Sequence, residues 1–346
     1  MKTLVKWYKW ILLAVIFQFC VLLYINNVFL NSDITVSITD VNKSKDVLTG
    51  DFKVPDNAQN ISMSYNAEFG AYLSDSVLHI INLDNGNIKK VAGMDNDKIT
   101  YFRWLPDRNM VIFSSDTKDG KKGIVQISTY EPDSETLRPY PQIDGLSAES
   151  KVMDIELSQY TNVVYAKIET SDTKSKIIRF NVMSQYAHVM NLGAKAIIKE
   201  CSFVNKLVYQ NEGESIYIYD GINKTKNKVP INVDKVQVLD IDLNDALYIG
   251  ILDTSGKVSE IYHQKINDDK LTDNWTKVVL KAATAIENII ISGNGNIYIN
   301  EIEENKIINA TNGLKASYRG EFIEVLDGAL VSKEGNKVII TSLKEY

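Results

Sequence analysis

The stretch FRWLPDRNMVIFSS (residues 102–115) holds two short apolar runs around a polar turn. The first run ends at Leu105 and the second begins at Met110. Both are rich in the aromatic and β-branched residues that favour strands. Between them, residues 106–109 are Pro-Asp-Arg-Asn, which is typical turn chemistry. The stretch therefore predicts two antiparallel strands joined by a turn, with Trp104 packed between sheets, and it does not indicate a reactive site.

Six other segments repeat this organisation. Each reads as a short strand, a polar turn and a second strand, and the second strands begin roughly 32–53 residues apart, a spacing typical of propeller blades. A further strand pair follows several of them, which gives the four strands per unit of a β-propeller. The segments are SMSYNAEFGAYLS (62–74), DIELSQYTNVVYA (154–166), KECSFVNKLVYQ (199–210), DIDLNDALYIGI (240–251), NIIISGNGNIYIN (288–300) and FIEVLDGALVS (322–332).

The two ends of the repeat region predict how the ring closes. The last unit stops at KVIITSLKEY (337–346), which we interpret as its third strand, so its outer strand is missing. The β-rich run DITVSITDV (33–41) lacks a partner, and pairing with the last unit would cover two exposed strand edges. We therefore predict an all-β propeller over residues 61–346, with seven blades favoured and six as the alternative. Residues 31–60 would supply the closing strand and a polar linker.

The repeat resembles the propellers of the TolB and dipeptidyl-peptidase IV N-terminal type. In that family, the inner strands of a blade read as an apolar run, a Ser/Pro-Asp-Gly-like turn and a second apolar run. Residues 102–115 are the nearest copy, residues 154–166 and 240–251 are degenerate copies, and most turns lack the glycine of the family. The resemblance covers residues 61–346 and implies a shape, because propellers host many functions.

The N-terminus predicts a membrane anchor. From Trp10 to Ile25 every residue except Gln18 is apolar or aromatic, and the run continues to Leu30. About 20 such residues are enough for a helix to cross the ~30 Å hydrocarbon core of a bilayer. We therefore predict a transmembrane helix over residues 10–30.

The flanks of this run favour an uncleaved anchor with a defined orientation. A cleaved signal peptide would have a shorter apolar region ending in small residues, whereas Phe29 and Leu30 at this exit are bulky. Lys2, Lys6 and Lys9 precede the run without any acidic residue, which places residues 1–9 in the cytoplasm and the propeller outside. The predicted location is a single-pass protein of the cell membrane with an extracytoplasmic propeller.

Composition argues against several classes of partner and fold. The net charge of the 346 residues is −6, so we expect no nucleic-acid partner and no polybasic adhesion to lipid. The abundance of Lys, Asn and Ile is associated with A+T-rich bacterial genomes, and we predict a bacterial source. Cys20 would lie in the membrane and cannot pair with Cys201, which we interpret as a small buried apolar residue.

The sequence contains no motif that identifies a catalytic, cofactor-binding or metal-binding residue. The GxSxG, HExxH, P-loop and dinucleotide patterns are missing. His79, His188 and His263 lie in the outer hairpins of different units and are poorly placed to converge. DIDLND (240–245) resembles the start of a calcium loop but lacks its glycine and its terminal glutamate, so we interpret it as a solvated turn. We expect no cofactor and no metal.

Two functional hypotheses follow. The first is a membrane-anchored extracytoplasmic propeller that binds or scaffolds an envelope protein, a peptide or a glycan without catalysis. The alternative is an extracytoplasmic hydrolase or lyase with its active site in the central channel. It requires several ionisable side chains that converge within about 5–10 Å at the innermost strands. A sensor that signals through the helix is a third, weaker hypothesis.

Overall fold

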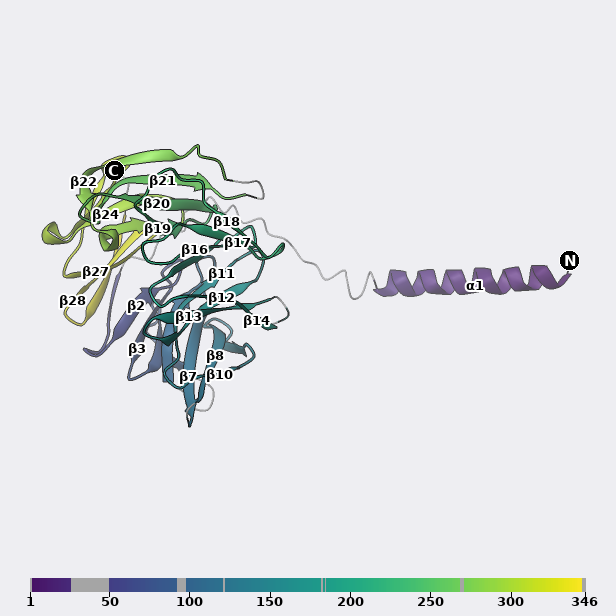
Figure 1. Cartoon of the computed structure of the whole chain (residues 1–346). Coiled ribbons are helices and arrows are strands. Elements are labelled where there is room, and N and C mark those ends of the chain that lie inside the picture. The colour runs from purple at the N-terminus through teal and green to yellow at the C-terminus, as the bar shows by residue number, and fades with distance from the viewer. Residues whose placement is uncertain are drawn as a thin grey trace. The chain divides into compact units, whose positions relative to one another are not determined.

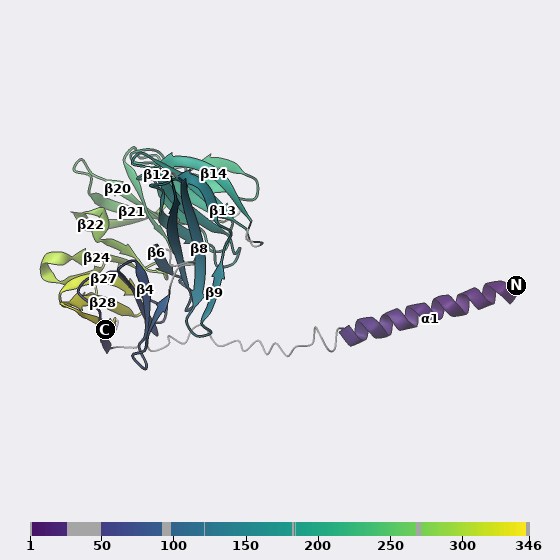
Figure 2. The same ribbon diagram turned by 90° about the horizontal axis from the view of Figure 1, so that it is seen from below.

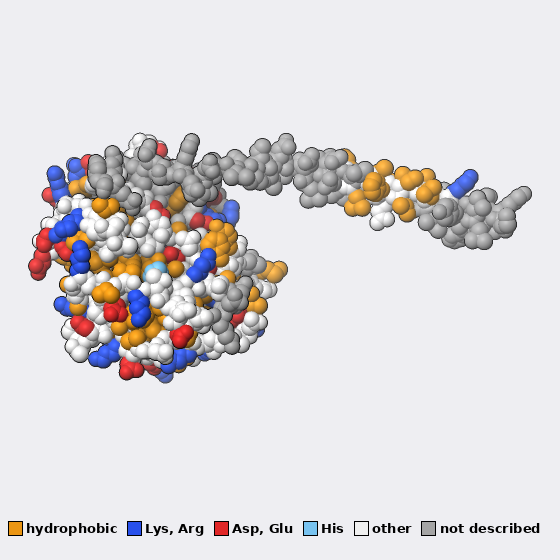
Figure 3. Space-filling model, turned by 90° about the horizontal axis from the view of Figure 1, so that it is seen from above, with side chains coloured by type: hydrophobic (Ala, Val, Ile, Leu, Met, Phe, Trp, Pro, Cys, Tyr) orange, Lys and Arg blue, Asp and Glu red, His pale blue; other side chains and the backbone are white. Residues whose placement is uncertain are grey.

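The structure is a computed structural model that describes residues 2–25, 50–91, 98–120, 122–181, 183, 185–267 and 271–343. The chain divides into two compact units, Met1–Ser44 and Lys45–Tyr346. The first unit contains helix α1 (Lys2–Ile25), whose described side chains are mostly exposed and hydrophobic (Figure 3). Within the part of the chain that is described, no helix combines the length and the apolarity needed to cross a membrane. The predicted span over residues 10–30 is therefore not confirmed, and its last five residues lie outside the described ranges.

The second unit is a β-propeller of seven antiparallel sheets in the described residues (Figure 1). Within each sheet, neighbouring strands pair in antiparallel fashion from the innermost strand to the outermost one. The second sheet has a fifth strand. The first blade contains β2 (Gln59–Met63), β3 (Phe69–Ser74), β4 (Val77–Asn82) and β5 (Ile88–Val91). The second contains β6 (Lys98–Trp104), β7 (Val111–Asp119), β8 (Lys122–Glu131) and β10 (Ile143–Ser147), with β9 (Thr136–Pro139) also paired to β8.

The next four blades follow in chain order. The third contains β11 (Lys151–Leu157), β12 (Val164–Ser171), β13 (Lys174–Phe180) and β14 (Tyr186–Gly193). The fourth contains β15 (Ile197–Glu200), β16 (Lys206–Gln210), β17 (Tyr217–Asp220) and β18 (Thr225–Lys228). The fifth contains β19 (Val236–Ile241), β20 (Ala246–Leu252), β21 (Val258–Lys265) and β22 (Thr276–Thr284). The sixth contains the short helices η3 (Ile286–Asn288) and η4 (Ile302–Glu304) and the strands β23 (Ile289–Ile291), β24 (Ile297–Glu301), β25 (Lys306–Asn309) and β26 (Lys315–Ser317).

The seventh blade joins the two ends of the propeller and confirms the predicted number of blades. It contains β27 (Glu321–Leu326), β28 (Ala329–Glu334) and β29 (Lys337–Ser342), with β1 (Gly50–Lys53) as its outer strand. Strand β27 contacts β2, so the last blade lies beside the first (Figures 1 and 2). All seven predicted repeat segments fall on the hairpin formed by the two innermost strands of a blade.

The strand that closes the ring is not the one that the sequence predicted. Residues 33–41 lie outside the described ranges, and the pairing strand β1 comes from the segment that we predicted as a polar linker. In β1 only Phe52 is buried, so the strand carries almost no apolar alternation that could reveal it. Phe52 lies opposite Val338 and packs in the core shared by the first and last blades.

Trp104 packs between sheets, as predicted. It is buried in the core of the first and second blades, with its ring 6.3 Å from that of Phe69. The indole Nε1 donates a hydrogen bond to the carbonyl of Ser62, 3.2 Å away, so the polar edge of the ring is satisfied. The stretch that revealed the fold therefore joins two adjacent blades.

Candidate functional site

Charged side chains from four successive blades meet near the central axis. Arg103, Glu156, Lys199 and Asp240 lie on the innermost strands β6, β11, β15 and β19, and we call them the charge ladder. Arg103 Nη1 lies 2.8 Å from Glu156 Oε1, and Lys199 Nζ lies 3.5 Å from the same oxygen. Lys199 Nζ also lies 3.0 Å from Asp240 Oδ1. The signs therefore alternate from blade to blade, and every charge has an opposite neighbour.

The most deeply buried member of the ladder is Glu156, and the two ends of the ladder, Arg103 and Asp240, are the most exposed. The Glu156 side chain is 7% exposed, whereas that of Arg103 is 38% exposed. Burial acts to raise the pKa of Glu156, but the charges of Arg103 and Lys199 outweigh it and hold that pKa below its usual range. On the same strand, burial and the charge of Glu156 raise the pKa of Asp154, which accepts a hydrogen bond of 3.1 Å from the Tyr101 hydroxyl.

This convergence is the arrangement that a channel-centred enzyme would require. The four ladder charges nevertheless neutralise one another in ion pairs between blades. A general acid or base must contact a substrate, whereas Glu156 is enclosed by its two cations. The contacts therefore favour a role in holding four blades together.

Replacing Glu156 with glutamine should lower the free energy of unfolding by about 2–3 kcal/mol. Removing one partner of a fully buried pair costs about 3–5 kcal/mol, and the solvent exposure of Arg103 reduces that cost. Chemical denaturation of the full chain measures the change. Glu149→Gln is the matched control, because its ion pair with Lys118 is exposed and should contribute less than about 1 kcal/mol. Equal effects of the two variants would contradict the structural role of the ladder.

A second buried carboxylate lies where the first and last blades meet. Glu324 on β27 accepts hydrogen bonds from the backbone N–H of Met63, at 2.6 Å, and from the Ser62 hydroxyl, at 3.1 Å. Burial raises the pKa of Glu324 to about 7, although both hydrogen bonds act to lower it. The closing interface thus contains a carboxyl group that titrates near neutral pH.

One end of the propeller carries the turns that join the first and second strands of the blades. Adjacent turns contact each other around the ring: Asn109 Nδ2 donates to Glu68 Oε2 at 2.7 Å, and the backbone N–H of Leu243 donates to the carbonyl of Gly293 at 2.9 Å. Because strands in a blade alternate in direction, the turns between third and fourth strands lie at the same end. We call this end the turn face.

Two aromatic side chains project from the turn face. Tyr160, after β11, and Phe203, after β15, stack with ring centroids 4.2 Å apart and an angle of 18° between the rings. Their exposed fractions are 63% and 48%, which is high for large apolar side chains. We call this pair the aromatic platform. The exposed side chains of Met183 and Ile222 belong to third-to-fourth turns of the same two blades.

Hydrogen bonds between blades hold the platform in place. The Tyr160 backbone N–H and the Ser158 hydroxyl both donate to the carbonyl of Ser202, at 3.3 and 2.7 Å. The Asp245 carboxylate of the fifth blade accepts from the backbone N–H groups of Ser202 and Phe203, at 2.5 and 2.9 Å. Burial raises the pKa of Asp245, and these N–H groups act to lower it. Three blades therefore fix the backbone beneath two exposed rings.

The three histidines lie on outer strands of three blades. His79 on β4 stacks on Tyr72 at 4.9 Å, and His263 on β21 stacks on Tyr248 at 5.1 Å. His188 on β14 contacts Asn191. No three His, Cys, Asp or Glu side chains in the described residues form a group that could hold a metal ion.

The carboxylates of DIDLND (240–245) are used in internal contacts. Asp240 belongs to the charge ladder, and Asp245 holds the turn beneath Phe203. Asp242 Oδ1 accepts hydrogen bonds from the backbone N–H groups of Asn244 and Ala246, at 2.9 and 2.8 Å. The segment therefore contains the end of β19 and the turn after it, as predicted, but the prediction that this turn is solvated was wrong, because Asp242 and Asp245 are buried.

No protein family model matches the sequence, and no curated protein is significantly similar to it. Similar solved structures are propellers. The β-propeller domain of the Trilobed protease from Pyrococcus furiosus, which has an open velcro topology, is 12% identical with a TM-score of 0.55, and the match covers 84% of this chain and 95% of that one. A prolyl endopeptidase is 11% identical with a TM-score of 0.51, over 83% of this chain and 43% of that one.

A chain from the mitotic checkpoint complex is similar to the same degree. It is 12% identical with a TM-score of 0.52, and the match covers 87% of this chain and 96% of that one. This chain spans less than half of the prolyl endopeptidase chain that it matches. At these identities the likeness shows the fold alone. It confirms the propeller and its resemblance in fold to a prolyl endopeptidase and to the propeller of the Trilobed protease.

Proposed function

We propose that the chain is a non-catalytic binding propeller whose turn face binds a protein or peptide partner through the aromatic platform. The observation that carries this proposal is the exposed, stacked pair of Tyr160 and Phe203, whose backbone is held by hydrogen bonds to neighbouring blades. Rigid aromatic side chains lose little conformational entropy on binding and are enriched among the residues that dominate binding energy. The similarity to a chain of the mitotic checkpoint complex, which is an assembly of proteins, agrees with this role.

Chemical crosslinking in cells that produce the chain, followed by affinity purification of the full-length protein, tests the proposal. The double variant Tyr160→Ser/Phe203→Ser should lose at least about tenfold of the recovered partner, because each lost hot-spot aromatic costs on the order of 2 kcal/mol of binding. Ile302→Ser is the matched control. Ile302 is also an exposed apolar side chain, but it lies in a turn between second and third strands, at the opposite end.

Three outcomes would contradict the proposal. Equal recovery of the same partner by the double variant and by wild type would exclude the platform as the binding surface. If the recovered partner resisted protease treatment of the eluate but was destroyed by glycosidase, the partner would be a glycan and not a protein or peptide. Loss of partner in the Ile302→Ser control would place the interface at the other end.

Membrane anchoring is part of the same proposal, and the sequence of residues 10–30 supports it. The apolar run follows Lys2, Lys6 and Lys9, so we propose a cytoplasmic N-terminus and an extracytoplasmic propeller in a bacterial cell membrane that presents the turn face to an envelope protein. Alkaline carbonate extraction should leave the full chain in the membrane pellet and release a chain without residues 1–31. Release of the full chain, or protection of the propeller from external protease in intact spheroplasts, would contradict anchoring in this orientation.

A further inference from the structure

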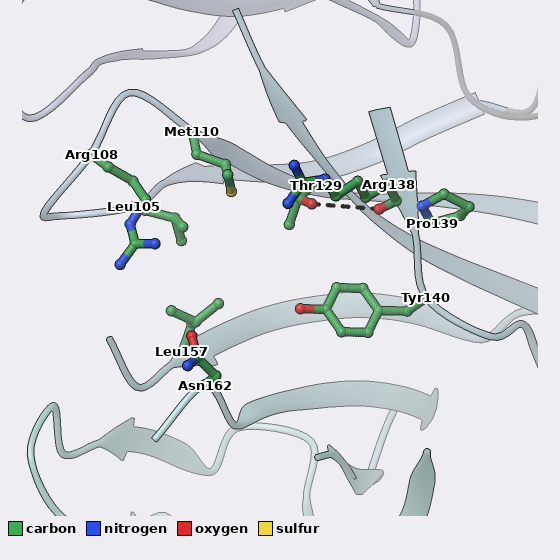
Figure 4. Close-up of a pocket in the computed structure, with 9 residues that line it drawn as sticks. All are labelled: Leu105, Arg108, Met110, Thr129, Arg138, Pro139, Tyr140, Leu157 and Asn162. Atoms are coloured by element: carbon green, nitrogen blue, oxygen red, sulfur yellow. Dashed lines mark hydrogen bonds between the residues drawn. The ribbon is translucent and has the colours of Figure 1, made fainter. Parts of the chain in front are cut away.

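A pocket of about 230 Å³ lies on the turn face between the second and third blades (Figure 4). Its first wall is the turn of the FRWLPDRNMVIFSS stretch, and the others come from β8, from β9 with the residue after it, and from the hairpin of the third blade. Small-molecule sites usually measure about 300–1,000 Å³, so this pocket fits a smaller group. The lining residues are Leu105, Arg108, Met110, Thr129, Arg138, Pro139, Tyr140, Leu157 and Asn162.

The polar side of the pocket is positively charged. Arg108 and Arg138 line it, and no carboxylate is among the lining residues. Asp107 neutralises Arg108 from outside, with both carboxylate oxygens 3.0 Å from Arg108 Nε, and Glu131 contributes a further negative charge there. Arg138 forms no ion pair with any described residue within 4.0 Å, so it supplies the uncompensated positive charge.

A tyrosine hydroxyl also lines the pocket. Tyr140 packs edge-on against Phe180, with ring centroids 5.1 Å apart. Figure 4 shows Arg108 and Leu105 on one side of the pocket and Tyr140 on the other, with the Tyr140 hydroxyl directed into the space between them. Burial raises the pKa of Tyr140, so the hydroxyl stays a hydrogen-bond donor at neutral pH.

Aliphatic side chains line another part of the pocket, and the lining continues toward the platform. Leu105, Met110 and Leu157 provide aliphatic surface beside the polar groups. Asn162 lines the pocket and lies two residues after Tyr160, so their Cα atoms are at most about 7 Å apart. A chain bound in the pocket would therefore leave it next to the aromatic platform.

We propose that this pocket binds the carboxyl terminus of a peptide segment of the partner, a step that rests on the proposed function. Arg138, with Arg108 and the Tyr140 hydroxyl, would hold the carboxylate, because a planar guanidinium matches carboxylate geometry. One uncompensated positive charge suits a monoanion better than a phosphate dianion. The apolar wall takes the last side chain, and the preceding residues pass over Tyr160 and Phe203.

Peptide capture by the full-length chain in detergent tests this pocket. The probes are a pool of random N-acetylated heptapeptides with free carboxyl termini and the same pool with amidated termini, and captured peptides are quantified by mass spectrometry. Wild type should enrich free acids that end in an apolar residue at least about tenfold over the matching amides, since charge-assisted hydrogen bonds to the carboxylate are lost in the amide. Arg138→Gln should abolish this preference.

Arg319→Gln is the matched control, because Arg319 is exposed and does not line the pocket, and it should keep the preference. Equal capture of acids and amides by wild type, capture of neither pool, or an unchanged preference in Arg138→Gln would overturn the proposal. The proposed function fails separately: it fails if Tyr160→Ser/Phe203→Ser leaves partner recovery unchanged, whatever the peptide pools show.

Discussion

The substitution Phe52→Ala should lower the free energy of unfolding of the propeller by about 3–5 kcal/mol, the range for removing a buried aromatic ring. Phe52 is the buried side chain of the closing strand β1, and its ring reaches the first blade. A Cβ atom on Gly70 would lie only 2.8 Å from Phe52 Cζ, so the ring fits against a position where no side chain is present. Its loss would leave a cavity between the two blades that close the ring.

Denaturant titration of the full chain measures this effect, and Asp51→Ala is its control. Asp51 lies on the same strand, but its ion pair with Lys337, at 2.9 Å, is exposed and should contribute less than about 1 kcal/mol. If Phe52→Ala and Asp51→Ala had the same small effect, β1 would not close the propeller in solution.

The substitution Glu324→Gln should stabilise the protein by about 3 kcal/mol at pH 8 and leave its stability nearly unchanged at pH 4. The folded-state pKa of Glu324 is raised to about 7 from the usual 4.5, so the unfolded chain loses its proton first as pH rises. Wild-type stability therefore falls between about pH 4.5 and 7, and the difference corresponds to about 3 kcal/mol. Glutamine cannot ionise, and its amide oxygen can still accept the hydrogen bond from the Met63 N–H.

The measurement is unfolding free energy against pH for wild type, Glu324→Gln and Glu321→Gln. Glu321 is exposed on the same strand, so its variant should follow the wild-type profile. If the difference in unfolding free energy between wild type and Glu324→Gln stayed constant between pH 4.5 and 7, the folded-state pKa of Glu324 would not be raised and the prediction would be wrong.

The seven inner hairpins were predictable because their signal is local. Each hairpin needs two short β-favouring runs and a turn, and both lie within about a dozen residues of the sequence. The repeat of that pattern then sets the number of blades. The closing strand β1 was not predictable in the same way, because an outer strand of four residues with one buried side chain has no periodicity to detect.

The features of the candidate site depend on neighbours far apart in the sequence. Glu156 and its cations come from three different blades, and only the stacking of the sheets brings them together. A signal for the platform did exist: Tyr160 and Phe203 are aromatic residues in corresponding turns of adjacent repeats, where polar residues are expected. Their stacking and the Asp245 contact could come only from the structure.

We propose that a partner binds to the turn face at Phe203. Photocrosslinking in the producing cells tests it most directly, with a photoreactive amino acid placed at position 203 in one full-length variant and at position 302 in another. We predict one reproducible protein adduct from position 203 and none of that mass from position 302, since the two exposed positions lie at opposite ends of the propeller. The same adduct from both positions, or an adduct from position 302 alone, would contradict the claim.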